Sequence, residues 1–103
     1  MAVYIINNLV IHDHEEYGRY EHAFLATFLP FDGEVLAVRD DPKPHEGEWP
    51  FTRTVLLRMP SEDVMQAWYE SDGYQAIVKL RLDATVSNVV VLPEFKMPGR
   101  RAA

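Results

Sequence analysis

The chain contains no cysteine in its 103 residues, which excludes disulfide bonds, thiolate nucleophiles and cysteine-ligated metals. That composition agrees with a reducing compartment, and we predict a cytoplasmic protein. Positive charge is also scarce, with 10 Lys and Arg against 16 Asp and Glu and a formal net charge of -6. Because negative charge repels phosphate backbones and the pair Arg100-Arg101 is too small to offset it, we predict no nucleic-acid partner.

Long apolar runs and phosphate-binding motifs are missing as well. Asn7-Asn8 ends the first apolar run early and no basic segment precedes it, so we expect neither a signal peptide nor a membrane partner. There is no glycine-rich loop, and Ser61 has no adjacent histidine, which disfavours nucleotide binding and nucleophilic hydrolysis. The length fits one domain, which we place at residues 1–95, with a flexible tail at 96–103.

The residues that are present predict alternating helices and strands. Asp13 and Ser61 stand where helix N-caps are expected, each followed by acidic residues that favour the positive end of a helix macrodipole. Pro30 and Asp32-Gly33 end the first helix, and Asp72-Gly73 interrupts the second before a further helical piece. Around these helices, runs rich in β-branched residues predict strands at Val3 to Ile11, Glu34 to Arg39, Arg53 to Met59 and Asn88 to Leu92.

The resulting order is β-α-β-β-α-β, the α+β, ferredoxin-like arrangement of an antiparallel sheet with helices on one face. An antiparallel sheet with one wet face alternates apolar and polar residues, but Val35 to Val38, Val55 to Leu57 and Val89 to Leu92 are apolar in succession. Two helices can cover one face of this sheet. A second copy packed sheet against sheet would cover the other, so we predict a homodimer through the sheet face. The alternative is a monomer with a partly apolar exposed face.

Several short motifs carry a family resemblance over Tyr4 to Leu92. The central ones are Glu46-Gly47-Glu48-Trp49, Arg53, Pro60-Ser61 and Trp68-Tyr69-Glu70-Ser71 with Tyr74. Nearer the N-terminus the matching residues are Tyr4, Asp13, Tyr17 and Tyr20. On these residues the chain resembles the family called domain of unknown function 1330, within the dimeric α/β-barrel superfamily.

This resemblance implies a ferredoxin-like fold that pairs into a dimeric α/β barrel. The family has no agreed activity, so the resemblance implies no catalytic residues. Related families on the same barrel include cofactor-free oxygenases, isomerases and stress-related binding proteins. That relation concerns the fold, which does not by itself establish a function.

Aromatic residues and two strand arginines are the candidates for a ligand pocket. Arg53 opens the third strand in phase with its apolar residues, so it can bind a ligand carboxylate, or it can pair with Glu46 or Glu48 and hold the loop. Arg39 at the end of the second strand has the same two interpretations. Aromatic rings can line a cavity for a flat ligand or fill the core. The pocket candidates are Tyr17, Tyr20, Arg39, Trp49, Arg53 and Trp68.

Other polar residues leave further options open. His12 and His14 would share a face of an extended strand, but they flank the Asp13 cap and no third ligand is evident, so we predict no metal site and no cofactor. Asn7 and Asn8 are unexpected within an apolar strand. They can satisfy a buried polar contact or orient a ligand.

The function that fits these features best is a small cytoplasmic homodimer that binds a small aromatic or carboxylated molecule between sheet and helices. A catalytic alternative is a cofactor-free oxygenase or isomerase, with tyrosine or histidine carrying a proton in a cavity that excludes water. A third possibility is a structural or interaction protein without a small ligand, which an occluded core would favour.

Overall fold

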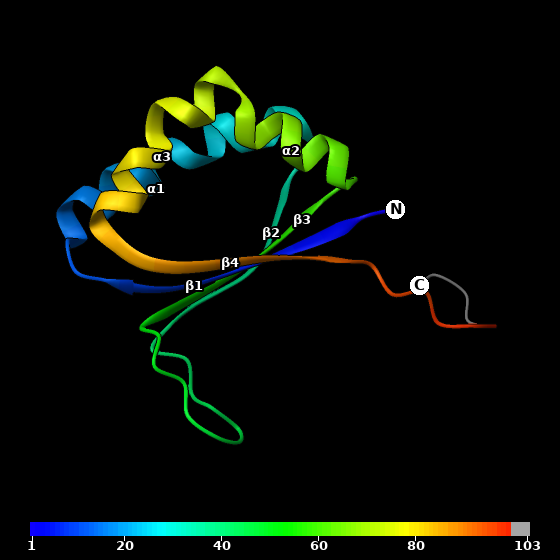
Figure 1. Cartoon of the computed structure of the whole chain (residues 1–103), viewed down its shortest axis with the longest axis horizontal. Helices are drawn as coiled ribbons and strands as arrows, with labels where there is room; N and C mark the ends of the chain where they lie inside the picture. Colours follow the sequence, from blue (N-terminus) through cyan, green and yellow to red (C-terminus); the bar gives the residue numbers. More distant parts are fainter. Residues whose placement is uncertain (100–103) are drawn as a thin grey trace.

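The computed structural model describes residues 1–99, which form four strands and three α-helices (Figure 1). The sheet is antiparallel throughout, in the order β2-β3-β1-β4. This confirms the predicted α+β, ferredoxin-like fold, with α2 and α3 together in the place of the second helix. The elements are β1 (Val3–Ile11), α1 (His14–Phe28), the 3-10 helix η1 (Leu29–Phe31), β2 (Glu34–Asp40), β3 (Arg53–Met59), α2 (Glu62–Glu70), α3 (Asp72–Ala84) and β4 (Thr85–Pro93).

Side-chain caps start the helices as the sequence predicts. The Asp13 carboxylate accepts a hydrogen bond from the backbone N–H of Glu16 at 3.1 Å, and Ser61 Oγ accepts one from Val64 at 3.1 Å. Each cap satisfies a donor that a helix N-terminus leaves unpaired. The positions at which α1 and α2 begin are therefore set by local sequence.

Two boundaries differ from the prediction. The break between α2 and α3 falls at Ser71 rather than at Asp72-Gly73, because Ser71 Oγ donates to the Trp68 carbonyl at 2.6 Å and accepts from the Tyr74 N–H at 3.2 Å. Strand β4 begins at Thr85 rather than Asn88, because its first residues pair with the far end of β1, where Thr85 lies opposite Ile11. The strand is therefore extended by a long-range pairing that no local pattern indicates.

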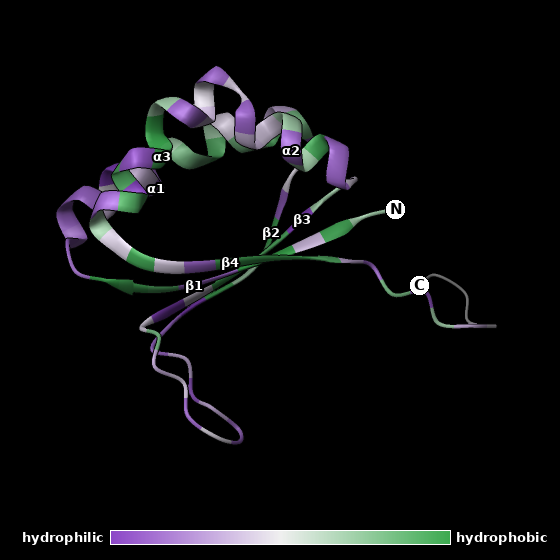
Figure 2. Cartoon of the chain, viewed as in Figure 1, coloured by the Kyte–Doolittle hydropathy of each residue, from purple (hydrophilic) through white to green (hydrophobic). Residues whose placement is uncertain are grey.

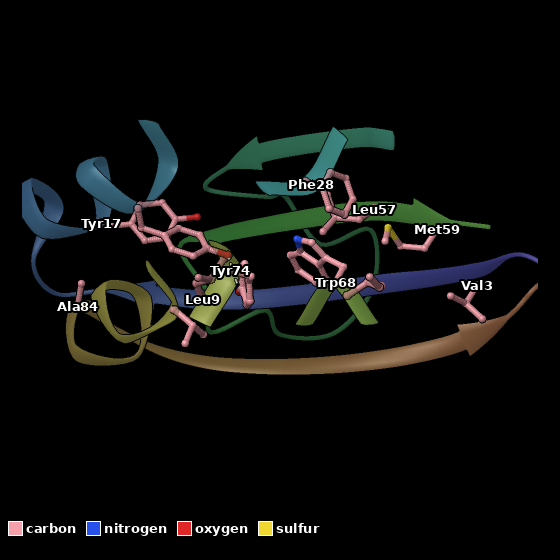
Figure 3. Close-up of a cluster of buried hydrophobic side chains, with 12 residues drawn as sticks. Val3, Leu9, Tyr17, Phe28, Leu57, Met59, Trp68, Tyr74 and Ala84 are labelled. Atoms are coloured by element: carbon pink, nitrogen blue, oxygen red, sulfur yellow. Dashed lines mark hydrogen bonds between the residues drawn. The ribbon is translucent and has the colours of Figure 1, made fainter. Parts of the chain in front are cut away.

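The helices lie on one face of the sheet, and the core fills the space between the two layers (Figures 1 and 3). Phe28 and Trp68 pack edge to face with their ring centroids 5.2 Å apart. A Cβ atom at Gly33 would lie 2.4 Å from the Phe28 ring, so glycine is required where β2 follows η1. Within residues 1–99 no helix is long and apolar enough to cross a membrane.

The opposite side of the sheet, called here the outer face, is also largely apolar. Residues paired across an antiparallel sheet share a face, and Ile6 lies opposite both Leu56 and Val90. The loop between β2 and β3 projects from this side in Figure 1, and Figure 2 colours much of β1 and β4 as hydrophobic. The expectation of a sheet with two apolar faces is thus confirmed. The apolar residues of the outer face include Tyr4, Ile6, Val10, Ala37, Leu56, Val86, Val90 and Leu92.

The predicted tail at 96–103 lies partly outside the described residues, which end at residue 99, and the pair Arg100-Arg101 falls there. Phe95 and Met97, which precede that point, are exposed. Strand β4 itself ends at Pro93, beyond which Glu94 N–H donates to the Ala2 carbonyl at 2.9 Å.

We predict that Ser71→Ala lowers the free energy of unfolding by about 1 to 2 kcal/mol, because the hydroxyl serves both helices at the break. Urea unfolding checks this. The matched variant Ser61→Ala removes a cap with a single hydrogen bond and should cost less. An equal or larger loss in Ser61→Ala would contradict the dual role of Ser71.

Candidate functional site

A cavity of about 300 Å³, called here the main cavity, lies between α1 and the strands β2 and β3. Its α1 side is formed by residues on one helical stripe, Tyr17, Tyr20 and Phe24. Its floor is formed by alternate residues of β3, which point towards the helices. The complete lining is Asn7, Tyr17, Tyr20, Glu21, Phe24, Leu25, Val35, Val38, Arg53, Val55 and Leu57.

Arg53 is the cation of the main cavity, and two carboxylates already hold it. Its Nη1 donates to Asp40 Oδ1 at 2.7 Å, and its Nη2 forms an ion pair with Glu21 Oε2. The prediction of Glu46 or Glu48 as its partner is therefore wrong. Asp40 takes that place because it lies directly opposite Arg53 in the β2–β3 register.

The tyrosines of α1 are buried beside these charges. The Arg53 guanidinium carbon lies 5.7 Å from the centre of the Tyr17 ring. Burial raises the pKa of Tyr17 above its usual range, and the nearby Arg53 charge partly opposes this effect. Tyr20 forms a 2.7 Å hydrogen bond with the hydroxyl of Tyr74. Burial is the main cause that raises the pKa of Tyr20 strongly, and the nearby Tyr74 hydroxyl raises it further. Both tyrosines are neutral at physiological pH.

A smaller cavity of about 50 Å³, called here the inner cavity, lies deeper among the helices and the sheet. It shares Asn7, Tyr20, Phe24 and Leu57 with the main cavity, so these side chains border both spaces. Asn7 Oδ1 is buried and has no hydrogen-bond partner among residues 1–99. The next residue, Asn8, accepts from Thr54 Oγ1 at 3.1 Å, which gives it a structural explanation that Asn7 lacks.

Arg81 of α3 also lines the inner cavity and is only 4% exposed. Its Nη1 donates to Ser87 Oγ at 2.7 Å, and its guanidinium carbon lies 5.9 Å from the Tyr20 ring centre. Among residues 1–99 it forms no ion pair, and its buried Nε has no partner. The candidate residues inferred from sequence did not include it. The available signal was its position on the buried stripe of α3 with Tyr74 and Val78.

The structure separates the six residues proposed from sequence. Tyr17, Tyr20 and Arg53 meet at the main cavity. Arg39 and Trp49 lie instead at a cavity of about 510 Å³ between the β2–β3 loop and the outer face, where Trp49 Nε1 donates to Thr54 Oγ1 at 3.1 Å. Trp68 is a core residue, 4% exposed, that reaches the inner cavity.

His12 and His14 flank the Asp13 cap and are exposed. In the part of the chain from 1 to 99, no group of three or more His, Cys, Asp or Glu residues is placed to hold a metal ion. The polar groups that line the main and inner cavities are tyrosine hydroxyls, the Asn7 amide, the Glu21 carboxylate and the two arginines Arg53 and Arg81.

The fold and its cavities define a ferredoxin-like α+β protein with an apolar pocket between sheet and helices. By sequence, residues 2–95 match the family described as domain of unknown function (DUF1330), and the chain belongs to that family. No curated protein matches the chain by sequence.

Solved structures with the same fold share little sequence with this chain. One is RPA0582, a protein of unknown function from Rhodopseudomonas palustris, with a TM-score of 0.79 and 17% identity over 93% of this chain and 84% of that one. The cofactor-independent oxygenase SnoaB from Streptomyces nogalater has a TM-score of 0.69 and 10% identity over 96% and 98% of the two chains. A dimeric ferredoxin-like protein of unknown function from Thermobifida fusca has a TM-score of 0.61 and 12% identity over 89% and 90%.

The raised pKa of Tyr20 predicts a loss of stability in alkali. The folded protein keeps this proton where the unfolded chain, whose tyrosines ionise near pH 10, has lost it, so the free energy of unfolding falls as the pH rises above about 10. Tyr20→Phe should reduce that fall, measured by urea unfolding at about pH 9 and about pH 11. Tyr69→Phe, which removes a tyrosine at the surface, serves as the control. Equal pH dependence in wild type and Tyr20→Phe would contradict the assignment.

Proposed function

We propose that this protein is a homodimer in which each subunit binds a small, largely apolar aromatic molecule in the main cavity. The observation that carries this proposal is the cavity itself, a pocket of about 300 Å³ whose rim residues Leu25, Val35 and Val38 are exposed, because this volume matches the lower range of small-molecule pockets. Its lining is mostly aliphatic and aromatic, with polar groups at Asn7, Tyr17, Tyr20, Glu21 and Arg53. That combination suits a flat ligand with a few polar atoms.

The ion pairs of Arg53 favour an aromatic ligand over a carboxylated one at this end of the cavity. One guanidinium faces two carboxylates, Asp40 and Glu21, so the group has a formal charge of -1. A ligand carboxylate would have to displace an acidic side chain from Arg53 and would meet the remaining negative charge. A neutral ring avoids both costs and buries apolar surface against Phe24 and Val55.

The homodimer is supported by the outer face, which the helices do not cover. Its apolar strip runs across neighbouring strands, as the pairs of Ile6 with Leu56 and with Val90 indicate. A second copy is the partner that carries the same strip, and a two-fold axis matches such a surface to itself. The Thermobifida fusca protein of similar fold is itself described as dimeric.

Binding without turnover is preferred over catalysis. The likeness to SnoaB makes a cofactor-free oxygenase or isomerase worth testing, but 10% identity concerns the fold. Assays of activated aromatic substrates in air would detect such turnover. Oxygen consumption that is lost in Tyr20→Phe would overturn the binding-only view.

The main-cavity proposal predicts that Leu25→Trp abolishes ligand binding. Leu25 lines the cavity and is 48% exposed, so a larger side chain there would occupy the entrance and block an aromatic molecule. The measurement is the shift of melting temperature across a panel of phenols, naphthols and indoles. We expect at least one compound to stabilise the wild type and to lose its effect in Leu25→Trp.

The matched control is Leu82→Trp, which makes the same change on α3 at a residue that is 54% exposed and lines neither the main nor the inner cavity. It should keep the wild-type response. If no compound in a broad panel stabilises the wild type, or if both variants respond alike, the main cavity is not a binding site.

The dimer proposal predicts that Val90→Glu produces monomers. Val90 lies on the outer face and is 47% exposed in the single chain, so a carboxylate there would be buried twice in a two-fold interface. We expect the dimer dissociation constant to rise roughly 100-fold or more. Sedimentation over a range of protein concentrations measures this, with Leu82→Glu as a control for the added charge. A wild type that sediments as a monomer at micromolar concentration would refute the proposal.

A further inference from the structure

Within residues 1–99, Arg81 is a buried cation without an acidic partner. The side chain is 4% exposed; its Nη1 donates to the neutral Ser87 hydroxyl at 2.7 Å, and the neutral hydroxyls of Tyr74 and Tyr20 are also hydrogen-bonding neighbours of the guanidinium. Removing a charge from water is strongly unfavourable unless an opposite charge or a full set of hydrogen bonds offsets it. A guanidinium carries five N–H donors, and here the buried Nε remains unpaired. The site therefore has a positive charge without a counter-ion among residues 1–99 and one donor, Nε, without a partner.

The groups that the structure places beside Arg81 within residues 1–99 are neutral. They comprise Tyr20 from α1, Tyr74 from α3, Ser87 from β4 and Asn7 from β1, which lines the same cavity. When two hydroxyls form one hydrogen bond, one of their two protons is left to donate elsewhere. The Tyr20–Tyr74 pair can thus supply a further donor. A cation with hydroxyl donors in a low-dielectric space is the arrangement that stabilises a negative oxygen.

We propose that the inner cavity is an oxyanion site, in which Arg81 and the Tyr20–Tyr74 pair bind a single negatively charged oxygen group. Its volume of about 50 Å³ exceeds the ~10–15 Å³ needed for one water and accommodates a carboxylate as small as formate. The oxygen can come from such a free anion or from an ionised phenol or enol of the aromatic molecule in the main cavity. Binding of an ionised aromatic molecule rests on the proposed function, whereas binding of a free anion does not.

The arrangement of charges favours this orientation of a ligand. The Arg53 end of the main cavity has a formal charge of -1, while Arg81 adds an uncompensated positive charge behind Tyr20. An acidic aromatic molecule would therefore point its ionised oxygen inward. Tyr20, Phe24 and Leu57 border both cavities, so a modest side-chain movement would join them.

Sodium formate tests the site without an aromatic ligand. At about ten times its dissociation constant, formate should raise the melting temperature of the wild type by roughly 5 °C. Arg81→Met should lose this shift, and Arg19→Met, which removes an exposed arginine of α1, should keep it. Comparison at equal salt removes general salt effects. Arg81→Lys retains the charge and should keep part of the shift, which guards against a folding defect in the methionine variant.

The Arg81→Met variant also makes a prediction in the absence of any anion. Loss of a buried unpaired charge should leave the melting temperature unchanged or raise it by a few degrees, since methionine fills similar space without desolvated charge. Residues that serve binding often lower the stability of the fold, so replacing such a residue is expected to leave the melting temperature unchanged or to raise it. An equal formate shift in wild type and Arg81→Met would overturn the oxyanion site.

A second experiment uses 4-nitrophenol, whose phenolate form is yellow and whose neutral form is not. We expect the wild type to bind it with an increased phenolate fraction at neutral pH, and Arg81→Met to lose that increase. Binding in which the phenolate fraction is the same in both proteins would support the main cavity and overturn the oxyanion site. A formate shift that depends on Arg81, without binding of any aromatic, would support a free-anion site and refute the proposed function.

Discussion

The central strand β1 imposes the constraint on which the rest of the structure depends. It is paired on both sides, with β3 and β4, and its side chains alternate between the helical layer and the outer face. Val3, Ile5 and Leu9 are buried beneath the helices. The helices of a single subunit can cover one face of the sheet, so the same strand that organises the core also creates the need for a second covering layer.

The main cavity follows from how α1 packs over the edge of this sheet. Aromatic contacts join α1 to α2 and α3, as between Phe28 and Trp68 and between Tyr20 and Tyr74. Over β2 and β3 the facing residues are smaller, including Val35, Val38 and Val55, and they do not fill the space beneath the helix. Close packing on one side and short side chains on the other leave a pocket beneath the helix.

The fold was predictable from sequence because its signals are local, whereas the site depends on distant pairings. Asp13 and Ser61 act within one helical turn, so their positions alone indicate the helix starts. Arg53 pairs with Glu21 of α1 and Asp40 of the neighbouring strand β2. The sheet register and the docking of α1 bring these residues together, and no short sequence motif predicts the pairing. Arg81 was missed for a different reason: arginines in amphipathic helices are normally solvated, and burial of this one emerges only when α3 is docked.

The half-buried Arg53 and the buried Arg81 have opposite electrostatic settings, and that contrast argues for different roles. Arg53 reaches the surface and is neutralised by Asp40 and Glu21, so its charge is satisfied within the subunit and mainly stabilises the β2–β3 register. Arg81 is more deeply buried and lies among neutral hydroxyls. A fold under selection for stability alone would place an apolar side chain at position 81, as on the rest of that stripe. A negative group that binds beside Arg81, as in the proposed oxyanion site, would explain the retained charge, and under that proposal Arg81 rather than Arg53 would define the ligand chemistry.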